Sequence, residues 1–118
     1  MTYTKAELRQ CGIYRIVNTV NGKVYVGSTR RTFRVRWSTH RADLKSGRHG
    51  NRALQQDWVE LGPDVFSFEI LEVCERGISR DDLRLRELYY FQQLTNTLSR
   101  MHYSMSFPIS SERIRKVA

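Results

Sequence analysis

The 118-residue sequence contains no long hydrophobic run. Its apolar stretches fall well short of the roughly 18 residues that a membrane-spanning helix requires. The first ten residues, MTYTKAELRQ, also lack the apolar core of a secretory signal peptide. We therefore expect an intracellular protein that does not enter a membrane.

Cysteine is scarce as well. Cys11 and Cys74 are far apart in the sequence and form no CxxC pair, which predicts neither a zinc site nor a disulfide framework. We expect both to be small core side chains. Internal repeats and low-complexity linkers are absent too, so the length fits one domain, residues 1–118, with its core at about residues 10–107 and a short polar C-terminal tail.

Acidic residues are few relative to basic ones. The sequence has 12 Asp and Glu against 20 Lys and Arg, which gives a formal net charge of +8. Such an excess attracts phosphate backbones largely without regard to base sequence, although a basic soluble protein or one that visits anionic membranes has the same charge. The candidate nucleic-acid contacts are Lys23, Arg30, Arg31, Arg34, Arg41, Lys45, Arg48 and Arg52.

The stretch from Cys11 to Ser28 predicts a β-hairpin. Two runs rich in β-branched and aromatic residues flank Asn21-Gly22, a pair that favours a two-residue type I′ turn. With that turn, Tyr14 lies opposite Thr29. Because side chains alternate between the two faces of a strand, one face is then expected to carry Tyr14, Ile16, Asn18, Tyr25 and Gly27. The two tyrosines therefore point the same way, although strand aromatics are most often ordinary packing residues.

Helical spacing of apolar residues follows the hairpin. Phe33, Trp37 and Leu44 predict a helix over residues 32–46 that Gly47 ends, with Arg36 and His40 as neighbours beside this apolar stripe. A second helix, which Asn51 caps, is expected to run to Leu61 and to bury Leu54, Trp58 and Leu61.

The remaining elements complete an α+β fold. A capping box at Thr4 and Glu7 indicates a helical turn over residues 5–10, and Val65–Val73 has the composition of a third strand beside the hairpin. Ser79 or Asp81 is expected to cap a third long helix that ends near Thr97, and alternation over Met101–Phe107 indicates a final extended segment. The sequence thus predicts a small antiparallel sheet of about three strands flanked by helices.

Glu87 is the most informative position outside the hairpin. On its helix it shares a face with Leu83, Tyr90, Phe91 and Leu94, the stripe that should meet the core. Burying a carboxylate there costs roughly several kcal/mol unless it meets a cation, a metal ion or strong hydrogen-bond donors. Glu87 is thus either a ligand for a hard metal or a residue at the stripe's edge that pairs with a neighbouring arginine.

Hydrolysis of a phosphodiester needs a group that deprotonates or orients the water, a cation that stabilises charge on the phosphate, and a way to stabilise the leaving oxygen. The chain has candidate residues for each. Tyr14 or His40 could move the proton of the attacking water, and Arg36 could hold the phosphate with its guanidinium. A metal on Glu87 could stabilise the leaving oxygen. Each of these residues also has an ordinary interpretation, since surface histidines and ion-paired arginines are common on amphipathic helices.

Gly12-Ile13-Tyr14 and, after ten intervening residues, Tyr25-Val26-Gly27 resemble the paired motifs of the GIY-YIG nuclease family. Val26 departs mildly from the isoleucine of the family name. Arg36, His40 and Glu87 match, in order and approximate spacing, an arginine, a histidine and a metal-binding glutamate of that family, and His49 resembles a second histidine of its phage homing endonucleases. Family members commonly have an asparagine after a tyrosine near the end of the domain, where this chain has Ser104 after Tyr103. Either Ser104 or His102 substitutes, or this supporting contact is missing.

The resemblance implies a DNA endonuclease that acts through one divalent metal ion, Mg²⁺ with Mn²⁺ as a substitute, held by Glu87. It implies Tyr14 as the base or proton shuttle, assistance from Tyr25, Arg36 and His40 in the catalytic set, and supporting roles for Gly27, His49 and Ser104. The expected products bear 5′-phosphate and 3′-hydroxyl ends. The expected substrate is duplex DNA, and the expected setting is the cytoplasm of a bacterial or phage-infected cell.

Several alternatives stay open at this level. A non-catalytic nucleic-acid-binding module would keep the fold and the basic surface, and an effector or toxin that targets a protein partner is a third class. A single site must act twice or dimerise to cut both strands, so a homodimer is an open expectation. The sequence is also consistent with a stand-alone nuclease and with the catalytic domain of a larger protein.

Overall fold

A computed structural model of the chain describes residues 2–97 together with Tyr103. The elements follow one another in the order α1 (Lys5–Leu8), β1 (Cys11–Asn18), β2 (Val24–Thr29), α2 (Phe33–Ser46), α3 (Arg52–Leu61), a 3₁₀ turn η1 (Pro63–Val65), β3 (Phe66–Cys74) and α4 (Arg80–Thr97). The three strands form one antiparallel sheet in the order β2-β1-β3. The predicted α+β class, with a small antiparallel sheet flanked by helices, is therefore confirmed.

The hairpin forms, but its turn is longer than predicted. Tyr14 pairs with Gly27 and not with Thr29, which shifts the register by two residues. The side chain of Asn18 accounts for the difference, because its Oδ1 accepts the backbone N–H of Val20 at 3.0 Å and so organises a wider turn. Gly22 still takes the left-handed conformation, with φ of 78°. A shift of two residues leaves every side chain on its expected face.

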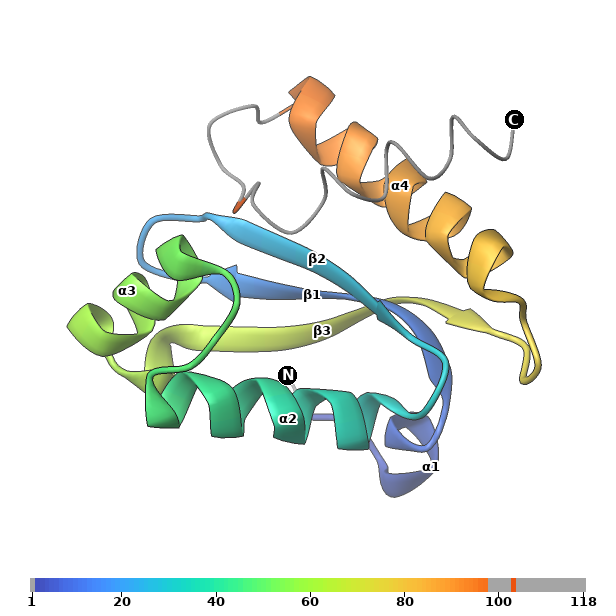
Figure 1. The fold of residues 1–118 in the computed structure, drawn as a ribbon, viewed down its shortest axis with the longest axis horizontal. Coiled ribbons are helices and arrows are strands. Elements are labelled where there is room, and N and C mark those ends of the chain that lie inside the picture. Colours follow the sequence, from blue (N-terminus) through green and yellow to red (C-terminus); the bar gives the residue numbers. More distant parts are fainter. Residues whose placement is uncertain (1, 98–102, 104–118) are drawn as a thin grey trace.

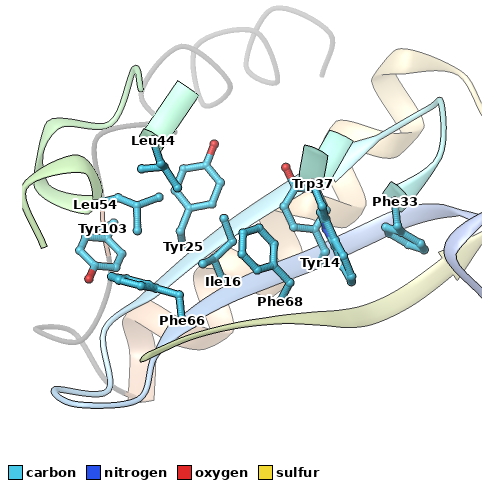
Figure 2. Packing of buried hydrophobic residues seen from close by; sticks show 10 residues of the cluster. All are labelled: Tyr14, Ile16, Tyr25, Phe33, Trp37, Leu44, Leu54, Phe66, Phe68 and Tyr103. Atoms are coloured by element: carbon cyan, nitrogen blue, oxygen red, sulfur yellow. The ribbon is translucent and has the colours of Figure 1, made fainter. Parts of the chain in front are cut away.

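Helices cover both faces of the sheet, as Figure 1 shows, with α2 and α3 on one side and α4 on the other. The α2 side holds the larger hydrophobic cluster, formed by Tyr14, Ile16, Tyr25, Phe33, Trp37, Leu44, Leu54, Phe66, Phe68 and Tyr103 (Figure 2). The α4 side holds a smaller one, formed by Ile13, Val24, Val26, Cys74 and Leu83. Both cysteines are free and buried, as expected.

The predicted ends of helices α2 and α3 are largely confirmed. Thr32 caps α2 by accepting the backbone N–H of Val35, and Gly47 ends it in the left-handed conformation. Asn51 caps α3 in the same way through the N–H of Leu54. One detail of α3 was wrong: Leu54 is buried, but Leu61 is 38% exposed. Leu61 is the last residue of the helix, where the chain turns away through Gly62 into η1.

The ends of the chain were predicted in part. The capping box of Thr4 and Glu7 is present, and the helix that follows it is the four-residue α1. Ser79, one of the two expected caps of α4, accepts the backbone N–H of Asp82 at 3.0 Å. The predicted extended segment Met101–Phe107 lies outside the described residues except for Tyr103, whose backbone N–H donates to the carbonyl of Val24 at 2.8 Å.

Candidate active site at the edge of strand β2

Tyr14 lies across the outer strand of the sheet. It stands on the central strand β1 opposite Gly27 of β2, and its side chain is fully buried. A Cβ added to Gly27 would lie 2.5 Å from the phenolic carbon and oxygen of Tyr14, so only glycine leaves room for the ring. The missing side chain of Gly27 therefore lets the Tyr14 hydroxyl reach the edge of β2.

Tyr25 points the same way as Tyr14, as the hairpin pattern predicted (Figure 2). Its ring centroid lies 5.3 Å from that of His40 and 5.8 Å from that of His49, in edge-to-face contacts. The two tyrosines and the two histidines therefore form one group between β2 and the C-terminal half of α2.

His40 projects from α2 onto Tyr14. Its Nε2 lies 2.5 Å from the Tyr14 hydroxyl oxygen, and its Nδ1 lies 2.8 Å from Nε2 of His49. His40 is only 1% exposed, and burial, together with the positive charge of Arg36, lowers its pKa to about 3. Burial lowers the pKa of His49 as well. Both imidazoles are thus neutral at pH 7, and His40 is a weak base.

Arg36 precedes His40 by one turn of α2, and its guanidinium is close enough to the Tyr14 hydroxyl to influence its pKa. Burial raises the pKa of Tyr14 well above its usual 10, and the nearby Tyr25 hydroxyl adds to the rise. The positive charge of Arg36 acts in the opposite direction, because it favours the phenolate. Tyr14 is therefore a phenol in the free protein, next to a cation that lowers the cost of removing its proton.

Glu87 reaches the same edge from the opposite face. It lies on α4, is 8% exposed, and accepts a hydrogen bond from the hydroxyl of Ser28 on β2. Burial raises the pKa of the Glu87 carboxyl, whereas the Ser28 hydrogen bond and the charges of Arg84 and Arg36 lower it. The predicted inward position of Glu87 is confirmed.

Ser28 is a site residue that the sequence analysis did not find. A signal was available, because Ser28 follows Gly27 on the strand and therefore faces the side opposite Tyr14. Strand β2 thus separates the two halves of the site: Tyr14, Tyr25, Arg36 and His40 on the α2 side, and Ser28 and Glu87 on the α4 side. The halves interact electrostatically around the edge, since Glu87 influences the pKa of Tyr14, and Arg36 that of Glu87.

The donor set at Glu87 agrees with magnesium better than with zinc. Within residues 2–97 and Tyr103, no three His, Cys, Asp or Glu side chains gather into a metal-binding group. Zinc sites usually have at least three protein ligands. Mg²⁺ keeps several waters and is often held by one or two carboxylates together with substrate phosphates, a requirement that one buried carboxylate can satisfy.

The predicted basic residues do not all gather at this edge. Arg30 hydrogen-bonds the carbonyl of Ile78, in the loop that leads to α4 and its Glu87. Arg41, by contrast, lies over the ring of Phe68 on β3, 4.2 Å from its centroid. Arg41 and Lys45 line a groove there with apolar residues of α3 and β3, on the flank of α2 that faces away from β2.

A second polar cluster ties Tyr103 to the hairpin turn. Its hydroxyl donates to Oδ2 of Asp57 at 2.7 Å, and the Asn18 amide donates to the same carboxylate oxygen at 3.3 Å. Sequence patterns gave no indication of this cluster, because its members come from β1, α3 and the chain beyond α4. Ser104, the predicted supporting residue next to Tyr103, lies outside the described residues.

A family model described as the GIY-YIG catalytic domain matches residues 10–103. The chain belongs to this family, and the two motifs that predicted the membership lie side by side on β1 and β2. Among the curated proteins, intron-associated endonuclease 1 of Enterobacteria phage T4 is 39% identical over 88 residues, which cover 75% of this chain. The aligned part is 34% of that relative, so the chain spans about a third of its length.

Two solved structures resemble this one. A mutant of the catalytic domain of intron endonuclease I-TevI superposes with a TM-score of 0.71 and 34% identity, over 82% of this chain and 94% of that one. A second structure of the catalytic domain of homing endonuclease I-TevI has a TM-score of 0.67 and 35% identity, over 79% and 97% of the two chains. Within the described residues, no helix of this chain is long and apolar enough to cross a membrane.

Proposed function

We propose that this protein is a metal-dependent DNA endonuclease. It hydrolyses phosphodiester bonds and leaves 5′-phosphate and 3′-hydroxyl ends. The observation that carries this proposal is the convergence of Tyr14, Arg36, His40 and Glu87, from both faces of the sheet, at the edge of β2 in a GIY-YIG catalytic domain. The names of the relatives, an intron-associated and a homing endonuclease, support the same substrate class.

Tyr14 is the proposed group that receives the proton of the attacking water. His40 is less suited to the task, because its lowered pKa makes it a weak base. As the water oxygen bonds to phosphorus, the bond from phosphorus to the 3′ oxygen breaks. Tyr14 takes the proton of the water and passes its own hydroxyl proton outward to solvent, and the 3′ oxygen takes a proton from solvent. Tyr25 lies beside His40, on the same side of the sheet as Tyr14, and assists.

Charge stabilisation is assigned to Arg36 and Glu87. The charge of Arg36 acts on the Tyr14 hydroxyl, so its guanidinium is near enough to hold a phosphate oxygen beside the attacking water. Glu87 would hold the metal ion, Mg²⁺ or Mn²⁺, which when bound would neutralise charge on the phosphate and on the leaving oxygen. Ser28 fixes the Glu87 carboxylate from the strand.

Duplex DNA is the proposed partner, with the net charge of +8 supporting backbone binding. One site cuts one strand at a time, so double-strand cleavage requires either a second encounter or a homodimer. The proposed location is the cytoplasm of a bacterial or phage-infected cell, where such DNA is present. The two free cysteines are in keeping with a reducing compartment.

The alternative is a binding module on the same fold that does not cleave. The structure favours the enzyme, because a binder gains nothing from a carboxylate that is 8% exposed on a helix face. A binder would show strongly salt-dependent affinity for DNA and no cleavage with any divalent metal.

The experiment is cleavage of supercoiled plasmid with Mg²⁺ or Mn²⁺, for the unaltered protein and for Glu87→Ala. The matched control is Glu60→Ala, which removes an exposed carboxylate of α3. We expect nicking or linearisation that EDTA and Glu87→Ala abolish and Glu60→Ala preserves. Retained DNA binding without cleavage in either metal would refute the enzyme and support the binding module.

A further inference from the structure

A continuous row of hydrogen bonds runs from the backbone of Asn51 to Tyr14. The N–H of Asn51 lies 3.0 Å from Nδ1 of His49, Nε2 of His49 lies 2.8 Å from Nδ1 of His40, and Nε2 of His40 lies 2.5 Å from the Tyr14 hydroxyl oxygen. All four ring nitrogens of the two histidines are used. The row therefore has a direction, which depends on where each imidazole carries its proton.

The first bond determines that direction. A backbone N–H can only donate, so Nδ1 of His49 accepts, and the single proton of this neutral ring is on Nε2. Nε2 of His49 then donates to Nδ1 of His40, whose own proton must be on Nε2. His40 in turn donates to the Tyr14 oxygen. In the opposite direction, Nδ1–H of His49 would point at the N–H of Asn51, donor against donor.

We propose that the backbone N–H of Asn51 is a positioning group that acts through His49 and fixes His40 as a hydrogen-bond donor to Tyr14. This inference rests on the proposed function for its catalytic meaning. Because the Tyr14 oxygen accepts from Nε2–H of His40, its own proton points away from His40, and one lone pair stays available for the proton of the attacking water. His40 cannot take that proton, and its part is to stabilise negative charge on the Tyr14 oxygen.

The fold holds Asn51 firmly in place for this task. The residue is 3% exposed, its Oδ1 accepts the N–H of Leu54 at the start of α3, and its Nδ2 donates to the backbone carbonyl of Tyr103 at 3.3 Å. The backbone N–H of His49 is also fixed, by Oε1 of Gln55 at 3.0 Å. The start of α3 thus orients the histidine pair.

Replacing His49 by Gln or by Glu, which have nearly the same shape as each other, separates the effect of hydrogen-bond direction from the effect of packing. In His49→Gln the side-chain amide can accept from the N–H of Asn51 and donate to His40, so the direction is kept. In His49→Glu the carboxylate only accepts, so His40 must place its proton on Nδ1 and then accepts from Tyr14. Asn51→Ala is the control for helix capping, since it removes the side chain of Asn51 and keeps its N–H.

The primary measurement is the tautomer of each histidine by long-range ¹H–¹⁵N NMR on the folded protein without metal or DNA. We expect Nε2–H for His40 and His49 in the unaltered protein and in Asn51→Ala, Nε2–H for His40 in His49→Gln, and Nδ1–H for His40 in His49→Glu. Plasmid cleavage should be at least ten-fold slower for His49→Glu than for His49→Gln.

Other results would overturn the proposal. Nδ1–H on either histidine of the unaltered protein would do so, and so would the same His40 tautomer in the Gln and Glu variants, which is what a packing role for His49 predicts. The NMR measurement needs no catalysis. A protein with the expected tautomers that never cuts DNA would therefore refute the nuclease function and leave the direction of the hydrogen bonds established.

Discussion

Replacing Gly27 by alanine should displace Tyr14 and damage both stability and cleavage. The added Cβ would lie 2.5 Å from the phenolic carbon and oxygen of Tyr14, whereas carbon atoms in contact are normally about 3.5–4.0 Å apart. The ring must therefore move by about 1 Å, in a core where it also packs against Phe33 and Trp37. Overpacking of this kind costs roughly 1–3 kcal/mol of unfolding free energy. A misplacement of about 1 Å at a reacting group can slow a reaction about 100-fold.

Urea denaturation and the rate of plasmid nicking would measure the two effects of Gly27→Ala. The matched control is Gly50→Ala, where an added Cβ meets nothing within 4 Å. A double-mutant cycle with Tyr14→Ala isolates the clash, because the destabilisation by Gly27→Ala should nearly vanish once the ring is gone. If Gly27→Ala is as stable and as fast as the unaltered protein, or if its cost persists without the ring, the proposed approach of Tyr14 across β2 is wrong.

Three further predictions concern titration and burial. The pKa of His40 is lowered to about 3 in the folded protein, so between pH 7 and pH 5 this imidazole takes up a proton in the unfolded chain but stays neutral in the folded one. The unfolding free energy should then fall by about 2 kcal/mol from pH 7 to pH 5, and less in His40→Gln; equal pH profiles would contradict this. The pKa of the Glu87 carboxyl is raised by folding, so at a pH above its unfolded pKa the ionised carboxylate destabilises the folded state. Glu87→Gln should therefore raise the midpoint of thermal unfolding at pH 8 while abolishing cleavage. A lower midpoint would contradict this. Asp57→Ala leaves the buried Asn18 amide and the Tyr103 hydroxyl without their shared acceptor and should cost about 1–3 kcal/mol in urea denaturation, unlike the exposed Asp64→Ala.

The sequence predicted the faces of the hairpin better than its pairing. Alternation alone places Tyr14 and Tyr25 on one side, and this survives any even shift of register. The register itself depended on Asn21-Gly22 acting as a two-residue turn. That expectation was wrong because of Asn18. Its side-chain oxygen accepts a hydrogen bond from the turn backbone, and its side-chain amide donates to Asp57 and Tyr103. These last two contacts depend on the tertiary fold, so no local pattern could have revealed them.

The same distinction applies to the candidate site. Helical periodicity was sufficient to place Glu87 on an inward face and His40 beside an apolar stripe, because both inferences use only spacing along one helix. The hydrogen bonds of Ser28 with Glu87 and of Asn51 with His49 depend on how different elements pack or on the geometry of a loop. The basic residues show the same limit, since Arg30 and Arg41 are close in sequence, but Arg30 contacts the loop before α4 whereas Arg41 lies over Phe68 on β3.

The edge of strand β2 is where residues from opposite faces of the sheet share one site. In the described part of the chain β2 pairs only with β1, and the one other backbone contact to it is the N–H of Tyr103 on the carbonyl of Val24, at the start of the strand. The edge beyond Val24, next to Gly27 and Ser28, is where Tyr14 and Glu87 approach each other. A further strand paired there would separate them. Edge strands are usually a liability that proteins cover. Here the backbone of Tyr103 covers one end of the edge, and the proposed substrate would enter at the other end, where the two faces meet.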